Sequence, residues 1–406
     1  MKKLLVLPAF LFQIIQGNAQ YKNDNVLYKT VYPEDLCNEL KNQPGYLLLD
    51  VRSKGEFEDS SSMAMNIGHL KDAININVRQ LGSRIGEVNG YKTRPVFVYC
   101  SHSQRSRRAS EMLADSGFTN VININGGMTA IQQLPYAQPC LKELVDTKVP
   151  YNIITYEELC NKLSGDKNDI FLLDVRSDSA YMHISNDAKI NAYGVLKNSN
   201  HISLVDIPSR IGSIPLNKEV ILIDLFGDDA AKAAIILRNK NFPLVSILPE
   251  GIDRYIESDK TKRPCMQDHY ISPINYKLIS APELRRFVES NKDFLVLDIR
   301  SKEEFVNKHE NSWQNIGHII NAVNIPAGDI GKHLFSIEKY KSKPVLLYGF
   351  SSNSYVYEVA NKLARNGFNN ILILTGGLFS VRWTAANIKG NDSLFQLVTD
   401  VPVQNL

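Results

Sequence analysis

Short apolar runs alternate with helical patterns along most of the chain. The clearest runs cover residues 47–50, 96–99, 171–174, 220–223, 295–298 and 345–348. Continuous runs rich in Val, Ile and Leu are typical of strands that are buried on both faces of a parallel sheet. The sequence therefore predicts an α/β fold built from small doubly wound parallel sheets.

The runs belong to an internal repeat that is written three times. The near-identical segments LLLDVRS, FLLDVRS and LVLDIRS place Asp50, Asp174 and Asp298 at even spacing. A second shared segment reads IGHLKDAININ in repeat one and IGHIINAVNIP in repeat three. Repeat two carries only a degraded version, which we assign to HISNDAKINA (183–192). The repeat predicts three tandem domains of similar size.

We place these domains at residues 20–142, 143–268 and 269–406. The first helical patterns of repeats two and three open with the capping-box sequences Thr155–Glu158 and Ser280–Glu283. The C-terminal LVTDVPVQNL resembles LVDTKVPYNI, which leads into repeat two. We expect this C-terminal stretch to pack as an edge segment on the third domain.

Residues 1–19 have the pattern of a cleavable signal peptide. Two lysines precede an apolar run at 4–15, and Gly-Asn-Ala follows with small residues at the cleavage positions. The run is too short for the roughly 20 residues of a membrane-spanning helix. Removing Lys2 and Lys3 lowers the formal charge of +3 by two, which gives no electrostatic reason to expect a nucleic-acid or membrane partner. We expect a periplasmic or secreted protein without a membrane span.

The five cysteines are an odd number, so at least one should stay free in an oxidising compartment. Cys37 and Cys160 occupy matching positions of helical patterns and are interpreted as helix-packing residues. Cys140 and Cys265 follow repeats one and two at matching distances, which leaves open a disulfide between them, although sequence alone cannot fix the connectivity. Cys100 would then be the free thiol.

Cys100 ends the run VFVYC and opens a polar turn that leads into a helical pattern. Ligands bind beyond the carboxyl ends of parallel strands, and N–H groups at a helix N-terminus form an anion-binding cradle. Such positions favour the thiolate form of cysteine. Arg105 adds a fixed charge whose fork can hold a sulfonate or carboxylate, and His102 adds to the positive field. We expect Cys100 to be a partly exposed, reactive nucleophile.

These motifs together resemble the rhodanese family, in three copies that cover nearly the whole mature chain. The resemblance implies that Cys100 takes a sulfane sulfur from a small anionic donor, thiosulfate-like or mercaptopyruvate-like, holds it as a persulfide and passes it to a thiol or cyanide. It implies no metal or organic cofactor. The implied substrate-binding loop consists of Ser101, His102, Ser103, Gln104, Arg105 and Ser106, with Ser106 starting the helix. The implied supporting residues are Asp50, Arg52, Gly68 and His69. Many family loops carry glycine where this one has Ser103, and the loop does not identify the donor.

Repeats two and three lack the thiol. Asp224 and Gly349 stand at the position of Cys100, so we expect both repeats to be non-catalytic, with structural or recognition roles that could include a protein partner. The acidic loop LFGDDA should spoil an anion cradle. We interpret Asp224 as a helix-capping residue.

Two other classes of function stay open. Cysteine phosphatases and arsenate reductases place arginine six positions after the cysteine, where this chain has Ser106, so the spacing favours sulfur transfer. A binding or redox-sensing protein, in which Cys100 forms mixed disulfides, is the alternative without an enzyme. No phosphate-loop or metal-ligand spacing occurs in the sequence.

Overall fold

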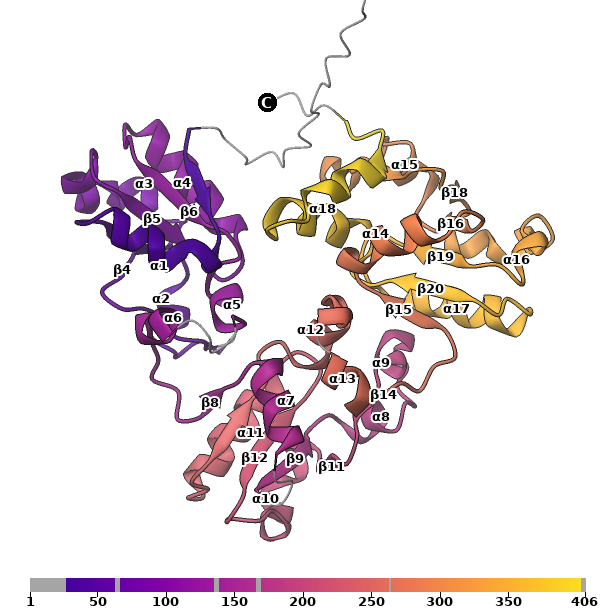
Figure 1. Ribbon diagram of the computed structural model, residues 1–406, viewed down its shortest axis with the longest axis horizontal. Coiled ribbons are helices and arrows are strands. Elements are labelled where there is room, and N and C mark those ends of the chain that lie inside the picture. The colour runs from indigo at the N-terminus through magenta and orange to yellow at the C-terminus, as the bar shows by residue number, and fades with distance from the viewer. Residues whose placement is uncertain (1–26, 63–65, 135–138, 166–168, 263, 403–406) are drawn as a thin grey trace, which may run out of the picture.

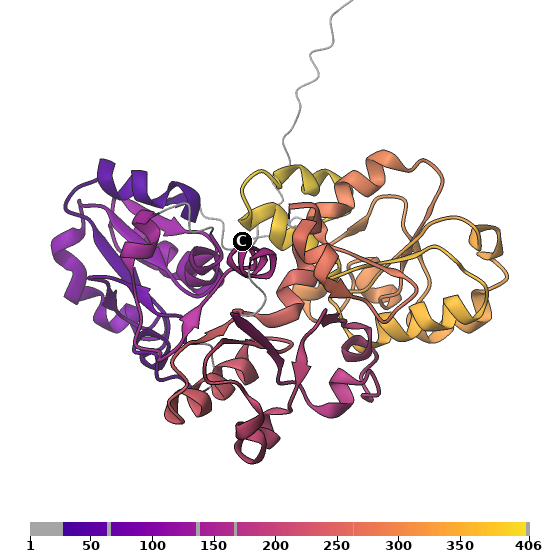
Figure 2. The same ribbon diagram turned by 60° about the horizontal axis from the view of Figure 1, so that its bottom comes forward.

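The computed structural model describes residues 27–62, 66–134, 139–165, 169–262 and 264–402. The predicted signal peptide lies outside these residues. The three repeats surround a central region, toward which α5, α12 and α18 are turned, one from each repeat (Figure 1 and Figure 2). Within the described residues, no helix is long and apolar enough to cross a membrane.

Each repeat contains one five-stranded sheet with all strand pairs parallel. In repeat one the order is β1 (Lys29–Val31), β6 (Val121–Ile124), β5 (Val96–Tyr99), β2 (Leu47–Asp50) and β4 (Ile74–Asn75). In repeat two it is β8 (Asn152–Ile153), β13 (Val245–Ile247), β12 (Glu219–Ile223), β9 (Ile170–Asp174) and β11 (Asn200–His201). In repeat three it is β15 (Lys277–Ile279), β20 (Ile371–Leu374), β19 (Val345–Tyr348), β16 (Leu295–Asp298) and β18 (Val323–Asn324). The predicted fold and its threefold repetition are confirmed.

The three repeats differ in the number of their helices among the described residues. Repeat one has α1 (Pro33–Asn42), α2 (Lys54–Phe57), α3 (Leu81–Arg84), α4 (Gln104–Asp115), α5 (Gly127–Gln132) and α6 (Pro139–Leu144). Repeat two has α7 (Tyr156–Ser164), α8 (Asp178–Tyr181), α9 (Ala188–Ala192), α10 (Ile207–Arg210), α11 (Asp228–Asn239), α12 (Gly251–Glu257) and α13 (Pro264–His269). Repeat three has α14 (Ala281–Ser290), α15 (Lys302–Phe305), α16 (Ile330–His333), α17 (Ser354–Arg365) and α18 (Gly377–Asn387).

The central strands are buried because helices cover both faces of each sheet. In repeat one, α1, α5 and α6 contribute to one apolar cluster with alternate residues of β2 and β5. The remaining residues of these strands pack with α3 and α4 on the other face, in the cluster that contains Cys100. This arrangement accounts for the uninterrupted apolar runs in the sequence.

Each repeat is completed by a short strand that follows it in the chain. β7 (Val145–Asp146) pairs antiparallel with β3 (His69–Leu70), β14 (Tyr270–Ile271) with β10 (Val195–Leu196), and β21 (Val398–Thr399) with β17 (His318–Ile319). The expectation that the C-terminal stretch packs on the third domain is therefore confirmed for β21. A glycine just before each of β3, β10 and β17 lies against a backbone carbonyl of the strand that pairs with it. A Cβ at Gly68, for example, would stand 2.5 Å from the Asp146 carbonyl oxygen.

The assignment of HISNDAKINA as the degraded shared segment of repeat two is wrong. Residues 188–192 form α9, and the structural counterpart of Gly68 is Gly194, just before β10. The α9 helix packs against α17 of repeat three, and the Ser354 hydroxyl accepts a hydrogen bond from the Ala188 N–H at 2.9 Å. Buried residues of repeats two and three consequently belong to one continuous apolar cluster.

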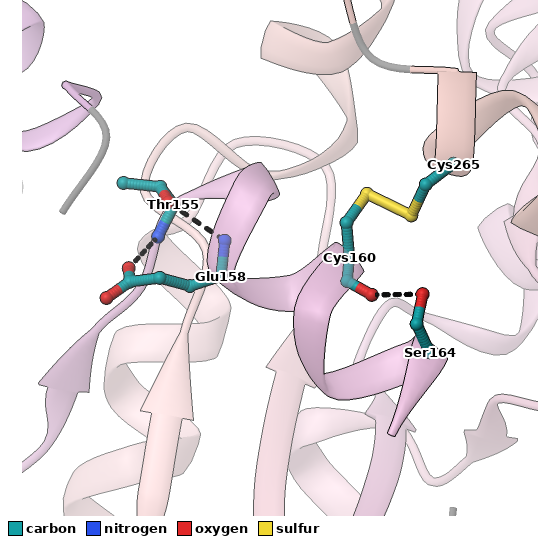
Figure 3. Close-up of a disulfide and its surroundings, with 5 residues drawn as sticks. All are labelled: Thr155, Glu158, Cys160, Ser164 and Cys265. Atoms are coloured by element: carbon teal, nitrogen blue, oxygen red, sulfur yellow. Dashed lines mark hydrogen bonds between the residues drawn. A yellow bond between two sulfur atoms is a disulfide. The ribbon is translucent and has the colours of Figure 1, made fainter. Parts of the chain in front are cut away.

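The cysteine pairing differs from the expected one. Cys37 bonds to Cys140, and Cys160 bonds to Cys265, so neither Cys37 nor Cys160 is merely a packing residue (Figure 3). Each bridge joins the first helix of a repeat to the helix that follows the same repeat, and no bridge joins Cys140 to Cys265. Figure 3 also shows Thr155 and Glu158 forming the predicted capping box at the start of α7. Cys100 is the free cysteine, as predicted.

Candidate active site

Cys100 directly follows β5 and lies at the base of a cavity between the repeats. Its side chain is 1% exposed, so the expectation of a partly exposed thiol is wrong. The thiol belongs to the apolar cluster that packs between the sheet and α4. The helix α4 begins at Gln104, two residues earlier than predicted, and the Cys100 Sγ lies 3.6 Å from the Ser106 Oγ in its first turn.

The Gly126-Gly127-Met128 segment at the start of α5 fixes the loop that carries the thiol. The N–H groups of Met128 and Thr129, at the start of α5, donate to the carbonyls of Cys100 and Ser101 at 2.9 Å each. A Cβ at Gly127 would stand 2.2 Å from the Cys100 carbonyl oxygen, so only glycine permits this approach. The Ser103 hydroxyl accepts from the Gly126 N–H at 2.6 Å. Ser103 therefore joins the two loops in the place where many rhodanese loops have glycine.

In the equivalent loop of repeat two, backbone N–H groups bind a carboxylate, although the residue before the helix, Gly227, has φ 94° where Ser103 has φ 171°. The Asp224 carboxylate accepts from the N–H groups of Gly227, Asp229 and Ala230 at 2.6, 2.9 and 3.2 Å. Burial raises the pKa of Asp224 to about 6, although the three N–H donors act to lower it. Asp224 binds the first N–H groups of α11, but it is not the N-cap that the sequence suggested, because Gly227 occupies that position. The backbone cradle is filled by the carboxylate of its own chain, which agrees with the expectation that it does not serve a substrate anion.

Repeat three has neither a thiol nor a carboxylate at this position. A Cβ at Gly349 would stand 2.8 Å from the Tyr355 hydroxyl. This hydroxyl therefore lies close to where a side chain at position 349 would begin. Ser352, three positions after Gly349, accepts from the Gly376 N–H as Ser103 does from Gly126. Repeat three thus keeps the hydrogen bond between the two loops but has no reactive side chain at the position of Cys100.

Arg105 does not present a free fork to the cavity. Its guanidinium donates to both oxygens of Glu56 at 2.8 and 2.7 Å and to the Ser101 hydroxyl at 2.8 Å. The hydrogen bonds to Glu56 raise the pKa of Arg105, and interaction with Cys100 raises it further. Burial alone would raise the pKa of Glu56, but hydrogen bonds from Arg105 and Ser53 lower it to about 2. Arg105 therefore forms an ion pair with Glu56 in place of the expected bidentate contact with a substrate anion.

Glu56 was missed by the sequence analysis, although a signal was present. Ser53 and Glu56 have the spacing of a capping box, and the structure forms that box at α2. The same spacing recurs at Ser301 and Glu304 in repeat three.

His102, in the loop after Cys100, contacts repeat two. Its Nε2 lies 3.3 Å from a carboxylate oxygen of Glu250, and its Nδ1 lies 3.0 Å from the Ser101 hydroxyl. Glu250 has a positive φ of 61°, where the corresponding residues of the other repeats are Gly126 and Gly376. Burial acts to raise the pKa of Glu250, but His102, Arg254 and Gln133 lower it overall.

Repeat three contacts the same loop from another side. The contact runs through the side chain of Asn125 in repeat one. Its amide oxygen accepts from the Ser103 hydroxyl at 2.8 Å, and its NH2 group donates to the Asn387 backbone carbonyl of repeat three at 3.0 Å. Arg107 donates to the Ala386 carbonyl at 3.2 Å. A cationic side chain at the last carbonyls of α18 is electrostatically favourable. Repeats two and three therefore both contact the Cys100 loop or the residues that hold it.

The cavity above Cys100 has a volume of about 1340 Å³ and is lined by all three repeats. Repeat one contributes the loop from Cys100 to Arg105, and repeat two contributes Lys189, Glu250, Arg254 and Glu257. Repeat three contributes residues that include Trp313, Phe379 and Trp383. Gln104 and Ser101 also face this cavity.

The supporting residues named from the sequence lie behind the site. Arg52 forms a fully buried pair with Asp50 at 2.7 Å and donates to the Gly68 carbonyl at 2.7 Å. The same pair recurs as Asp174–Arg176 and Asp298–Arg300. The His69 ring packs on Phe57 with centroids 4.1 Å apart. Asp50, Arg52, Gly68 and His69 are not among the described residues that line the cavity.

In the described parts of the chain, no group of three or more His, Cys, Asp or Glu side chains is placed to hold a metal ion.

Three matches to the rhodanese-like domain model, at residues 33–134, 155–258 and 280–383, cover most of the chain. The chain belongs to the rhodanese-like family and consists of three tandem copies of its domain. This is a sulfurtransferase-type family of enzymes.

Two curated relatives illustrate the likeness. An uncharacterized Bacillus subtilis protein, YqhL, is 35% identical over 130 residues, which are 31% of this chain and 90% of that protein. The thiosulfate sulfurtransferase GlpE of Shewanella oneidensis is 31% identical over 83 residues, 20% of this chain and 72% of that protein. A solved thiosulfate sulfurtransferase from Pseudomonas aeruginosa is 13% identical over 87% of this chain and 67% of its own, with a TM-score of 0.22.

Proposed function

We propose that the protein is a sulfurtransferase in which Cys100 carries the sulfur. The Cys100 thiolate attacks the sulfane sulfur of a small anionic donor that is thiosulfate-like or mercaptopyruvate-like. With thiosulfate, the S–S bond breaks and sulfite leaves with the bonding electrons. With mercaptopyruvate, whose sulfur is bonded to carbon, the C–S bond breaks and pyruvate leaves as its enolate. The Cys100 persulfide then gives its outer sulfur to a thiol or to cyanide, and Cys100 returns to the thiolate. No step needs a metal or an organic cofactor.

The binding of Asp224 in repeat two is the observation that carries this proposal. Three backbone N–H groups hold an anion at the third, fifth and sixth positions after the residue equivalent to Cys100. Ser103, Arg105 and Ser106 occupy those positions in repeat one. The first N–H groups of a helix have no partner within the helix, so those of α4 are suited to the negative charge on a persulfide.

The contacts of Arg105 support sulfur transfer over phosphate chemistry. In the phosphatase mechanism an arginine of the loop must bind the phosphate oxygens, but the Arg105 fork is taken by Glu56. A binding or redox-sensing role would require Cys100 to form a disulfide with the thiol of another protein, and the Cys100 side chain is buried in the cavity. Both alternatives are weaker than sulfur transfer.

Intact-mass analysis of the full chain after thiosulfate or mercaptopyruvate treatment tests the proposal. We expect a gain of one sulfur atom that cyanide removes as thiocyanate and that is absent in Cys100→Ser. A chain that takes up sulfur from no sulfane donor would favour the redox-sensing role. Hydrolysis of a small aryl phosphate that is lost in Cys100→Ser would favour the phosphatase.

We also propose that the protein is exported and works in the periplasm or outside the cell. The two disulfides support this location, because structural disulfides persist in oxidising compartments. The proposal predicts that the exported protein starts after residue 19, which N-terminal sequencing of the purified protein measures.

A further inference from the structure

The cavity is larger than the proposed donors or cyanide require. Pockets for drug-sized ligands have volumes of roughly 300–1,000 Å³, and this cavity has about 1340 Å³. Thiosulfate and cyanide contain only a few heavy atoms, so most of this space lies beyond the part that either would occupy next to Cys100.

Repeat three gives the cavity an aromatic wall. Both tryptophans of the chain, Trp313 and Trp383, line the cavity together with Phe379. Trp313 is 60% exposed and Phe379 is 42% exposed, although large aromatic side chains are usually covered. Phe350 lies between them, with ring centroids 5.2 Å from Trp313 and 5.9 Å from Phe379. We call Trp313, Phe350 and Phe379 the aromatic ledge.

The ledge is built on the loop that replaces the catalytic loop in repeat three. Phe350 directly follows Gly349, the counterpart of Cys100, and its carbonyl accepts from the Phe379 N–H at 3.0 Å. Phe379 and Trp383 are four residues apart on α18 and therefore share one face of that helix. The inactive site of repeat three thus presents flat apolar surface toward the cavity that holds the active thiol.

The wall from repeat two is polar and carries both charges. The Lys189 amine lies 3.2 Å from an Asp253 oxygen, and the Arg254 Nε donates to Gln133 at 2.8 Å. Glu257 also lines the cavity. A ligand that spans the cavity would meet rings on one side and charged groups on the other.

We infer that the cavity binds the sulfur acceptor and that this acceptor is a low-molecular-weight thiol with a flat aromatic or heteroaromatic ring and a polar group. The inference rests on the proposed sulfur transfer. A ring stacks favourably on exposed aromatic side chains, and the polar group faces the wall of repeat two. A folded protein cannot bring its own thiol to a sulfur that is 1% exposed beneath three repeats.

The transfer step balances without another reactant. The acceptor thiolate attacks the outer sulfur of the Cys100 persulfide, and the S–S bond to Cys100 breaks. Cys100 leaves as the thiolate, and the acceptor becomes a persulfide whose outer sulfur keeps the negative charge that it carried on Cys100.

A pair of matched acceptors tests the ring requirement. The full chain is loaded with thiosulfate and given 4-mercaptobenzoate or 3-mercaptopropionate, which share a thiol and a carboxylate but differ in the ring. We expect Trp313→Ala and Phe379→Ala to raise KM for 4-mercaptobenzoate roughly tenfold and to leave KM for 3-mercaptopropionate and thiosulfate unchanged. Phe335→Ala is the matched control, because Phe335 is 86% exposed in the same repeat and lies outside the described cavity lining.

Binding of 4-mercaptobenzoate to the Cys100→Ser chain, measured by calorimetry, tests the site without sulfur transfer. We expect binding that Trp313→Ala weakens. If the wild-type chain takes up no sulfur, the proposed function fails. The binding measurement then still tests whether the cavity binds a thiol that carries a ring. If sulfur loads normally but both acceptors and all variants give equal KM ratios, the ring inference is overturned. Transfer to a reduced protein dithiol with none to either small thiol would overturn it as well.

Discussion

Glu250 of repeat two lies 3.3 Å from the Nε2 of His102, two residues after the candidate nucleophile of repeat one. The contact depends on a residue in a left-handed conformation that glycine occupies in the other two repeats. A non-glycine residue with positive φ costs roughly 1 kcal/mol or more. Repeat two therefore keeps an unfavourable backbone conformation at Glu250, the residue whose side chain contacts the Cys100 loop.

This contact predicts that Glu250→Gln lowers the rate of sulfur loading. The amide keeps the size of the side chain but removes the charge that holds His102. We expect kcat/KM for thiosulfate to fall between about threefold and tenfold, with a melting temperature close to that of the wild type. Glu338→Gln, on the exposed surface of repeat three, is the control and should leave kcat/KM unchanged. An unchanged kcat/KM in Glu250→Gln would show that repeat two does not assist the loop.

The Glu56–Arg105 ion pair predicts a pH-dependent stability. The pKa of Glu56 is lowered to about 2, so its contribution is complete above the unfolded value near 4.5 and is lost as the pH falls through about 2. We expect Glu56→Gln to lower the free energy of unfolding by about 2 kcal/mol at pH 7, after discounting for solvent screening. Denaturant unfolding at several pH values measures the difference, which should shrink below pH 4.5.

Glu304→Gln provides the matched control for this pair. Glu304 forms the same capping box in repeat three, but the position of Arg105 is occupied there by Ser354. Its effect on stability should be smaller. Equal losses in both variants would assign the stability to the capping box and not to the ion pair.

Asp224 predicts a change of the opposite sign with pH. Its pKa is raised to about 6, so the wild-type fold loses stability relative to the unfolded chain as the pH rises from 3.8 through 6. Asp224→Asn removes this titration. We expect the variant to gain roughly 2 kcal/mol relative to the wild type between pH 4 and pH 7, measured by chemical unfolding.

Asp224→Ala separates the hydrogen bonds from the charge. It leaves three N–H groups of the cradle without their acceptor, and we expect a loss of roughly 2 kcal/mol at pH 4, with sulfur loading on Cys100 intact. A variant as stable as the wild type at pH 4 would contradict the role of Asp224 in the cradle.

The disulfides predict a large stabilisation of repeats one and two. Cys37–Cys140 closes a separation of 103 residues, for which the chain-entropy treatment gives about 4–5 kcal/mol. We expect the double variant Cys37→Ser/Cys140→Ser to lose stability of this order and to keep the sulfur loading of Cys100. Urea unfolding of the variant, compared with Cys160→Ser/Cys265→Ser, measures it. A loss below about 1 kcal/mol would contradict the estimate.

The sequence predicted what depends on local pattern. The uninterrupted apolar runs predicted the parallel sheets. The position of Cys100 at the end of such a run predicted its place at the carboxyl end of a central strand. The disulfide pairing could not be predicted, because Cys140 and Cys265 have similar surroundings in sequence and only packing on α1 and α7 distinguishes their partners. The role of Arg105 was wrongly predicted because its partner, Glu56, is distant in the chain. The contacts of His102 depend on how the repeats pack, which local sequence does not encode.

The added strands β7, β14 and β21 have a consequence for dividing the protein into parts. Each one is supplied by the chain that leaves a repeat, so a fragment cut after residue 142 would expose the backbone edge of β3 that Val145 and Asp146 now cover. Unpaired strand edges promote association between molecules. A fragment intended to stay monomeric should therefore carry this exit segment, and the unit that can be grafted or exchanged between such proteins ends beyond the strand rather than at the last helix.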